Sequence, residues 1–483
     1  MSGREENIVL FPFMAQGHLI PFLALALQIR QRTGCIVTVV NTPLNIRNLR
    51  SLLPPSTSIR LVELPFRSQD HGLPPESENT DLLPPTHVIR LVYASFSLKP
   101  SFKRLISDIT QQQGHPHVCI IADMLLGWTV EVANDLGILH FAFITGSAYG
   151  VAIFFSLWLE LPHRRTESDE FSLPDFPEVS RVHRSQLSAA LLNADGTDFL
   201  SICNQKNARL TLMSDGFLIN TVEEMDKIGL EHLRRKTARK VWPIGPTFSY
   251  FINKPRISQA DDAVRNCCVK WLDTHPINSV LYVSFGSQNS ISHSQMMELA
   301  KGLEASGKIF IWVLRSPIGF NVNEEFRSKE WLPDGFEERM RESNQGLLIR
   351  RWAPQLEILS HNSTCAFLSH CGWNSVLESL SQGVPIIGWP LAAEQFFNSK
   401  LLEEEMEVCV EVARGNSCEV GHEQIASVIE LVMGGTEKGE NLRRKACAVK
   451  EMIEDAVNDD ESYKGCSVKA MDEFFYFCRR KIE

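Results

Sequence analysis

The sequence predicts two α/β domains, each built around a parallel β-sheet with helices on both faces. Two observations support this prediction. Fully apolar runs of strand length alternate with helical runs along the chain, which is typical of buried parallel sheets. The chain also has 483 residues, which is more than a single hydrophobic core usually accommodates.

The expected strands are short runs rich in Val, Ile, Leu and Phe. In the first half they fall at 7–13, 35–41, 58–64, 117–122, 138–145 and 217–221. In the second half they fall at 279–284, 309–314, 347–350, 364–369 and 385–389. Helices are expected between them, including those at 21–32, 148–161, 294–306 and 375–382. Both halves therefore alternate strand and helix, although no internal sequence repeat relates them.

A stretch rich in Pro and Gly, 241–262, separates the two halves. We expect an N-terminal acceptor-binding domain over 1–245, a linker over 246–275, a C-terminal domain over 276–455 and a helical tail over 456–483. The tail is expected to pack back on the N-terminal domain. Because ligands of parallel sheets bind beyond the carboxyl ends of the strands, we expect the two domains to face each other across a cleft.

Composition excludes several classes of protein. The formal net charge is −10 and no basic run occurs, which argues against nucleic acid and anionic membrane surfaces as partners. The twelve cysteines form no C-x-x-C pair, so we expect buried, reduced thiols and a cytoplasmic protein. Uncharged runs at 7–29 and 141–159 are interrupted by Pro or Gly, which argues against a membrane span. The G-x-G-x-x-G and P-loop fingerprints are absent from the sequence.

The segment 370–375, with sequence HCGWNS, follows the expected strand 364–369 and precedes a helix. A strand, a glycine turn at Gly372 and a helix N-terminus together form an anion site, because unpaired amides and the helix dipole point at the bound group. His370 could donate a further hydrogen bond to a phosphate oxygen. A competing interpretation is a local capping box formed by Ser375 and Glu378.

The segment from Trp352 to Gln395 resembles, without a gap, the signature box of the plant family 1 UDP-glycosyltransferases. Positions at fixed spacings carry the resemblance, in the runs WAPQ at 352–355, HCGWNS at 370–375 and EQ at 394–395, and at Glu378. The run FPFMAQGH at 11–18 and the turn SFGS at 284–287 also resemble this family. The resemblance covers essentially the whole chain. It implies two Rossmann-like domains of GT-B type and a UDP-sugar donor.

The resemblance also implies roles for single residues. Trp352 would stack on uracil, whose flat face suits an indole. The residues that would contact uracil, ribose, diphosphate and sugar are Ala353, Gln355, His370, Trp373, Asn374, Ser375, Glu378, Glu394, Gln395 and Ser287. Trp352 and Trp373 could instead be core residues. Gln at the last position of the box favours glucose, and Thr145 matches a position that touches the donor sugar in relatives.

His18 and Asp123 are the candidate catalytic pair. Each lies close behind an expected buried strand, at the same edge of a parallel sheet. A histidine there could remove a proton near neutral pH, and a carboxylate could orient the ring and stabilise the imidazolium. The alternative is that His18 caps a turn and Asp123 caps the next helix. The resemblance favours catalysis, with inversion of the sugar configuration and with neither metal nor cofactor.

The sequence says less about the acceptor than about the donor. The regions expected to bind it, 13–17, 75–95 and 145–200, are apolar with occasional polar residues. Phe154, Phe155, Trp158, Leu159 and His163 belong to them, although core packing explains these residues equally well. We expect a hydrophobic hydroxylated acceptor, such as a flavonoid, another phenolic or a terpenoid, and a monomeric enzyme. Other classes that fit are a non-catalytic nucleotide-sugar-binding protein and an α/β hydrolase, although the G-x-S-x-G elbow is absent.

Overall fold

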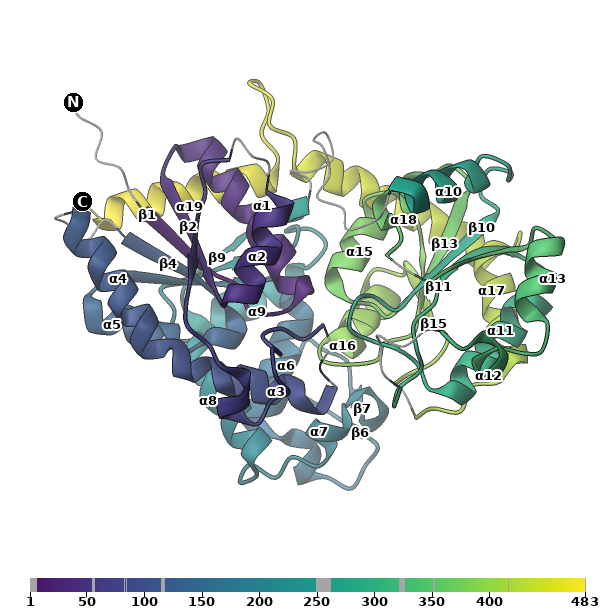
Figure 1. Cartoon of the computed structure of the whole chain (residues 1–483), viewed down its shortest axis with the longest axis horizontal. Coiled ribbons are helices and arrows are strands. Elements are labelled where there is room, and N and C mark those ends of the chain that lie inside the picture. The colour runs from purple at the N-terminus through teal and green to yellow at the C-terminus, as the bar shows by residue number, and fades with distance from the viewer. Residues whose placement is uncertain are drawn as a thin grey trace. The chain divides into compact units, whose positions relative to one another are not determined.

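The computed structural model describes residues 7–53, 57–81, 83, 85–113, 118–248, 262–320, 326–350, 352–415 and 417–482. The chain divides into two compact units. The first comprises Met1–Arg184, Ala189–Ile257 and Ala456–Glu483, and the second comprises Ser185–Ser188 and Ser258–Asp455. Each unit contains one large parallel sheet with helices around it (Figure 1).

The sheet of the first unit has seven parallel strands in the order β3-β2-β1-β4-β5-β8-β9. They are β1 (Asn7–Phe11), β2 (Ile36–Asn41), β3 (Arg60–Glu63), β4 (Val118–Asp123), β5 (Leu139–Ile144), β8 (Gly216–Ile219) and β9 (Lys240–Pro243). The chain first adds strands on one side of β1 and then returns to add β4 on the other side. The carboxyl ends of β1 and β4 therefore flank a topological switch point, where ligands of such sheets bind.

Helices and a short hairpin complete the first unit. The helices are α1 (Gln16–Thr33), α2 (Pro43–Leu52), α3 (Pro85–Ala94), α4 (Lys99–Gln113), α5 (Thr129–Leu136), α6 (Ala148–Glu160), α7 (Ala189–Leu192), α8 (Phe199–Thr211), α9 (Lys227–Thr237) and α19 (Cys466–Ile482). The hairpin pairs β6 (Glu170–Phe171) with β7 (Val182–His183).

The C-terminal helix α19 is part of the first unit, where Figure 1 shows it in yellow beside the purple α1 and β1. It buries Met471, Phe474 and Cys478 in the core that lies between the sheet and α1. The ring of Phe474 lies 5.0 Å from that of Phe141 and 5.3 Å from that of Trp242. Aromatic burial on this scale anchors the helix firmly to the sheet.

The sheet of the second unit has six parallel strands in the order β12-β11-β10-β13-β14-β15. They are β10 (Val280–Ser284), β11 (Ile309–Val313), β12 (Gly346–Ile349), β13 (Thr364–Ser369), β14 (Ile386–Gly388) and β15 (Cys409–Glu411). The helices are α10 (Asp262–Leu272), α11 (His293–Ala305), α12 (Ser328–Trp331), α13 (Phe336–Glu342), α14 (Gln355–Ser360), α15 (Trp373–Leu380), α16 (Gln395–Lys400), α17 (His422–Met433) and α18 (Glu437–Ala456). The switch point falls between β10 and β13.

Several details differ from the sequence predictions. Strands β9 and β15 were not predicted, and β9 begins where the linker stretch 241–262 was placed. Within the expected linker 246–275, α10 is helical and buries Cys268 and Leu272 in the core of the second unit. The rest of that range includes 249–261, which lies outside the described residues. The expectation of buried thiols is wrong for Cys267 and Cys447, which are exposed.

The apolar run 141–159 forms β5, a turn and most of α6, a helix of 13 residues. Among the described residues, no helix combines the length and the apolar composition that a membrane crossing requires.

Candidate active site

The first unit brings His18, Asp123 and Thr145 together at the carboxyl edge of its sheet. Strands β1 and β4 are neighbours, with Phe11 opposite Ala122, so the chain segments that follow them emerge side by side. Asp123 is the last residue of β4, and Thr145 directly follows the neighbouring strand β5. The sheet order, rather than closeness in sequence, assembles this cluster.

The geometry of the cluster suits proton transfer. His18 Nδ1 lies 2.7 Å from Asp123 Oδ2, with the Asp123 side chain fully buried and the His18 side chain 24% exposed. A buried carboxylate accepts, so Nδ1 carries the proton and Nε2 is the basic nitrogen of the ring. Thr145 Oγ1 lies 3.3 Å from the same Nδ1, a contact that the sequence did not predict. The pair can therefore act as a general base and its orienting carboxylate.

Asp123 also caps the short helix that follows it, because the Leu125 amide donates to its second oxygen, Oδ1, at 3.0 Å. The capping and catalytic interpretations of Asp123 are thus compatible. The N-cap of α1 is Ala15 rather than His18. Helix α1 begins at Gln16, so His18 lies in its first turn rather than on a loop before a helix at 21–32. The expected helix start, Pro21, lies inside the helix.

In the second unit, two glycines enclose His370. Gly286, in the turn after β10, has φ of 75°, and a Cβ there would lie 2.6 Å from His370 Nε2. A Cβ on Gly372 would lie 2.4 Å from the same nitrogen. Such distances are far below van der Waals contact, so both turns require glycine for the ring to fit. Ser284 and Ser369 are paired across β10 and β13, and this pairing sets the two turns side by side.

His370 is buried, with 8% of its surface exposed. Burial, followed by the charge of Arg315, lowers its pKa to about 4, so the ring is neutral near pH 7. Its Nδ1 is buried and has no hydrogen-bond partner among the described residues. An unpartnered buried nitrogen is costly, and a bound ligand would relieve that cost.

Helix α15 begins at Trp373, with Gly372 at its N-cap and no side-chain cap. The competing interpretation of Ser375 and Glu378 as a capping box is therefore wrong. Gln355 Nε2 instead donates to Ser375 Oγ at 3.0 Å and to Glu378 Oε2 at 2.6 Å. These three side chains form one polar network that could face the ribose and the nearer phosphate.

The two tryptophans of the box lie in different surroundings. Trp352 is 43% exposed, which leaves indole surface for a planar ligand. Trp373 is only 2% exposed, so the structure supports its core interpretation. Ala353 is half-buried and packs against the neighbouring core. Asn374 is half-buried in the first turn of α15.

Glu394 and Gln395 lie at the start of α16, after a turn in which Ala393 has φ of 52°. The amides of Leu391 and Ala392 donate to Gln395 Oε1 at 3.1 and 3.0 Å. Two donors on one oxygen fix the orientation of the amide, so Nε2 is the group that can donate to a ligand.

Sequence reasoning missed two residues that support this site. Arg315, which follows β11, contacts Trp352 of the box and the carbonyl oxygen of Ser287. Asn398 donates to the carbonyl of Cys371 at 3.0 Å and so supports a turn in which Cys371 has φ of 61°. A non-glycine residue in this region is strained and is usually held by its surroundings. The available signal for Arg315 was a basic residue at the carboxyl end of a predicted strand.

Most of the side chains suggested for the acceptor belong to the core. Phe155, Trp158 and His163 are 1%, 4% and 1% exposed. Phe154 and Leu159 are half-buried. The burial of the first three supports the core interpretation.

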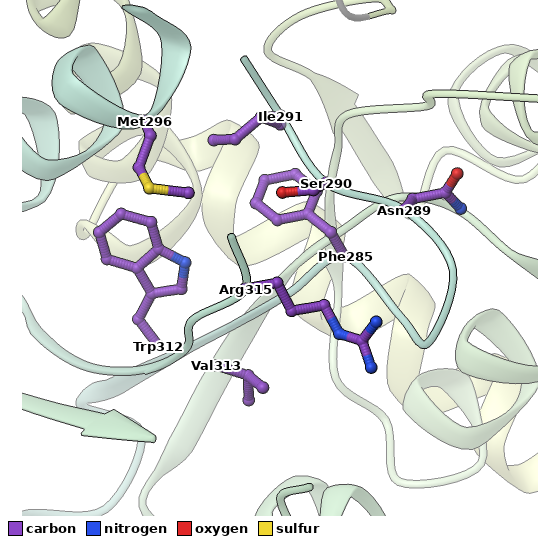
Figure 2. Close-up of a pocket in the computed structure, with 8 residues that line it drawn as sticks. All are labelled: Phe285, Asn289, Ser290, Ile291, Met296, Trp312, Val313 and Arg315. Carbon is purple, nitrogen blue, oxygen red and sulfur yellow. The ribbon is translucent and has the colours of Figure 1, made fainter. Parts of the chain in front are cut away.

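Beside the Gly286 turn lies a pocket with an apolar side formed by Phe285, Met296 and Trp312 (Figure 2). The Arg315 guanidinium points away from this apolar group. Among the described residues, no cluster of three or more His, Cys, Asp or Glu side chains has an arrangement that could hold a metal ion.

Comparison with known proteins agrees with this geometry. The family described as UDP-glucoronosyl and UDP-glucosyl transferase matches residues 258–447, and the family described as Glycosyltransferase, N-terminal domain, matches 5–249. UDP-glycosyltransferase 92A1 of Arabidopsis thaliana is 48% identical over 477 residues, covering 98% of this chain and 96% of that protein. Crocetin glucosyltransferase 3 of Crocus sativus is 46% identical, covering 89% of this chain and 90% of that protein. The structure of Medicago truncatula UGT71G1 complexed with UDP-glucose aligns with a TM-score of 0.80 at 27% identity, covering 98% of each chain.

The fold and these matches define a UDP-glycosyltransferase with the two parallel-sheet α/β domains of the GT-B class. More narrowly, the chain belongs to the plant family 1 UDP-glycosyltransferases. This assignment replaces the alternatives of an α/β hydrolase and of a non-catalytic binding protein.

Proposed function

We propose that the enzyme transfers glucose from UDP-glucose to a hydroxyl group of a hydrophobic plant secondary metabolite, with inversion, giving a β-O-glucoside. The observation that carries this proposal is the contact of 2.7 Å between His18 Nδ1 and buried Asp123. With Nδ1 held by the carboxylate, the opposite ring nitrogen, Nε2, is the proposed base.

In the proposed mechanism, His18 Nε2 takes the proton of the acceptor hydroxyl. The hydroxyl oxygen attacks the anomeric carbon of the donor glucose. The bond from that carbon to the diphosphate oxygen breaks, and UDP leaves from the opposite face. Asp123 stabilises the imidazolium that forms. His18 then returns its proton to solvent, which restores the base.

The donor is proposed to bind along the box of the second unit. Trp352 stacks on uracil, and Ala353 and Gln355 bind uracil and ribose. Glu378 binds the ribose hydroxyls. The diphosphate is bound by His370, Asn374, Ser375 and Ser287. The sugar is bound by Glu394, Gln395 and Thr145. The backbone amides at the N-terminus of α15 stabilise the negative charge that develops on the leaving diphosphate. These donors support our proposal that transfer requires neither a metal nor a cofactor.

Gln395 supports glucose as the transferred sugar, because its fixed Oε1 leaves Nε2 to donate to a sugar hydroxyl. We expect Gln395→His to raise the KM for UDP-glucose by about tenfold, as loss of one ligand hydrogen bond costs about 1–2 kcal/mol. Kinetics with UDP-glucose and UDP-galactose would measure this change. An unaltered preference between the two donors would remove Gln395 from sugar selection.

The acceptor class is supported by relatives rather than by individual side chains. Similar proteins include crocetin glucosyltransferase 3, at 46% identity, and scopoletin glucosyltransferase of Nicotiana tabacum, at 34%. A flavonoid, another phenolic or a terpenoid remains our proposal. We also propose a monomer in the cytoplasm, a reducing compartment that suits twelve free cysteines.

The direct test incubates the enzyme with UDP-glucose and a panel of flavonoid, phenolic and terpenoid acceptors. We expect UDP and a β-glucoside in equal amounts, with the anomeric configuration assigned from the proton coupling of the product. Release of UDP and glucose without any glucoside would contradict transfer. Binding of UDP without any turnover across the panel would contradict catalysis on these acceptors.

A further inference from the structure

Arg315 occupies a central place among the donor elements of the second unit. It follows the end of β11, and β11 lies between β10 and β12 in the sheet. The turn with Ser287 follows β10, and Trp352 follows β12. Parallel strands place these segments at the same edge, so Arg315 emerges between the expected binding sites of uracil and diphosphate.

The guanidinium makes contact with both neighbours. Its Nη1 donates to the carbonyl oxygen of Ser287. Its central carbon lies 5.9 Å from the centroid of the Trp352 ring, within the range of a cation–π interaction. Because Trp352 is still 43% exposed, the indole retains surface for a base.

Arg315 also places a positive charge near His370, where the diphosphate is proposed to bind. His370 is neutral near pH 7, so it offers the diphosphate a dipole rather than a full positive charge. Arg315 is close enough to His370 to disfavour protonation of the ring. An arginine keeps its charge at any physiological pH. The chain carries a net charge of −10, so attraction of a dianion depends on local cations of this kind.

We propose that Arg315 is a positioning residue for the nucleoside diphosphate, which braces the Trp352 indole, holds the Ser287 turn and supplies positive charge beside His370. This inference rests on the proposed donor site and adds a residue outside the signature box. The main contribution of Arg315 is electrostatic attraction of the diphosphate. Stacking of the base contributes less.

The test compares binding of UDP and of uridine, which lacks the phosphates, by isothermal titration calorimetry. We expect Arg315→Gln to weaken UDP binding by about 10- to 100-fold, the loss typical of a hydrogen bond or contact to a charged group. Uridine binding should weaken by less than about threefold, since an exposed cation–π contact contributes little. Arg315→Lys, which keeps the charge, should recover most of the affinity for UDP. Added salt should weaken UDP binding more in the wild type than in Arg315→Gln, because salt screens the lost charge.

Arg339→Gln is the matched control. Arg339 is another arginine of the second unit, on α13, and its guanidinium is paired with Glu304 at 2.6 Å. This variant should bind UDP as the wild type does.

Equal losses of UDP and uridine affinity in Arg315→Gln would overturn the electrostatic assignment, and so would unchanged UDP binding. Neither result would affect the proposed function, because wild-type turnover is measured separately. A wild-type enzyme that fails to bind UDP would instead contradict the proposed donor site itself.

Discussion

We expect His18→Ala to lower kcat by about 10²- to 10⁴-fold, the usual contribution of a general base. The variant removes the ring whose Nδ1 lies 2.7 Å from Asp123, and the proposed proton acceptor, Nε2, is lost with it. UDP binding should stay unchanged, because the donor box lies in the second unit. Single-turnover kinetics with UDP-glucose, together with calorimetry of UDP binding, would measure both quantities. Turnover within about tenfold of the wild type would exclude His18 as the base.

Asp123→Asn is the companion variant, because it separates the two contacts of this side chain. The new amide oxygen can still accept from the Leu125 amide, which keeps the cap. Its NH₂ group would then face His18 Nδ1 and favour the tautomer that has its proton on Nε2. We therefore expect a loss of kcat comparable to that of His18→Ala with little loss of stability. A large fall in the melting temperature would show that the structural contacts of Asp123 dominate.

The second large effect is expected for Gly286→Ala. The added Cβ would lie 2.6 Å from His370 Nε2, and φ of 75° is already unfavourable for alanine. Relief of the clash requires either the turn or the imidazole to move, at a cost of about 1–3 kcal/mol. We expect UDP affinity to fall by about 10- to 100-fold, measured by calorimetry.

Gly307→Ala provides a matched control for this prediction. Gly307 belongs to the same unit and has a similar φ of 63°, but a Cβ there would meet nothing within 4 Å. The control should lose about 1 kcal/mol of stability from backbone strain and keep its UDP affinity. If both variants weaken UDP binding equally, strain in the backbone rather than the contact with His370 is responsible.

Strands such as β1 and β10 could be predicted because they are fully buried and almost continuously apolar, whereas the edge strands β9 and β15 were not predicted. The starts of helices α1 and α15 could not be predicted, because Ala15 and Gly372 occupy the N-cap positions and form no side-chain hydrogen bond there. The expected helices began at Pro21 and Ser375, which are residue types common at helix starts, but both residues lie inside the observed helices.

The candidate site was predictable where a motif covered it and less so elsewhere. The sequence suggested His18, Asp123 and the box residues as candidates, but not the contact of Thr145 with His18 or the contacts of Arg315. Both depend on strand order, which sets β5 beside β4 and β11 beside β10. Neighbours along a sheet are decided by packing of the whole domain, and single residues carry little information about them.

The packing of α19 has a consequence for the order in which the protein matures. Phe141 and Trp242 are synthesised well before Phe474, and most of the second unit, Ser258–Asp455, is translated in between. Domains usually fold in turn as they leave the ribosome. Here the apolar surface that receives α19 stays uncovered until translation has passed the second unit. The first domain to be synthesised is therefore the last to be completed. The surface around Trp242 stays accessible to chaperones until α19 has been synthesised.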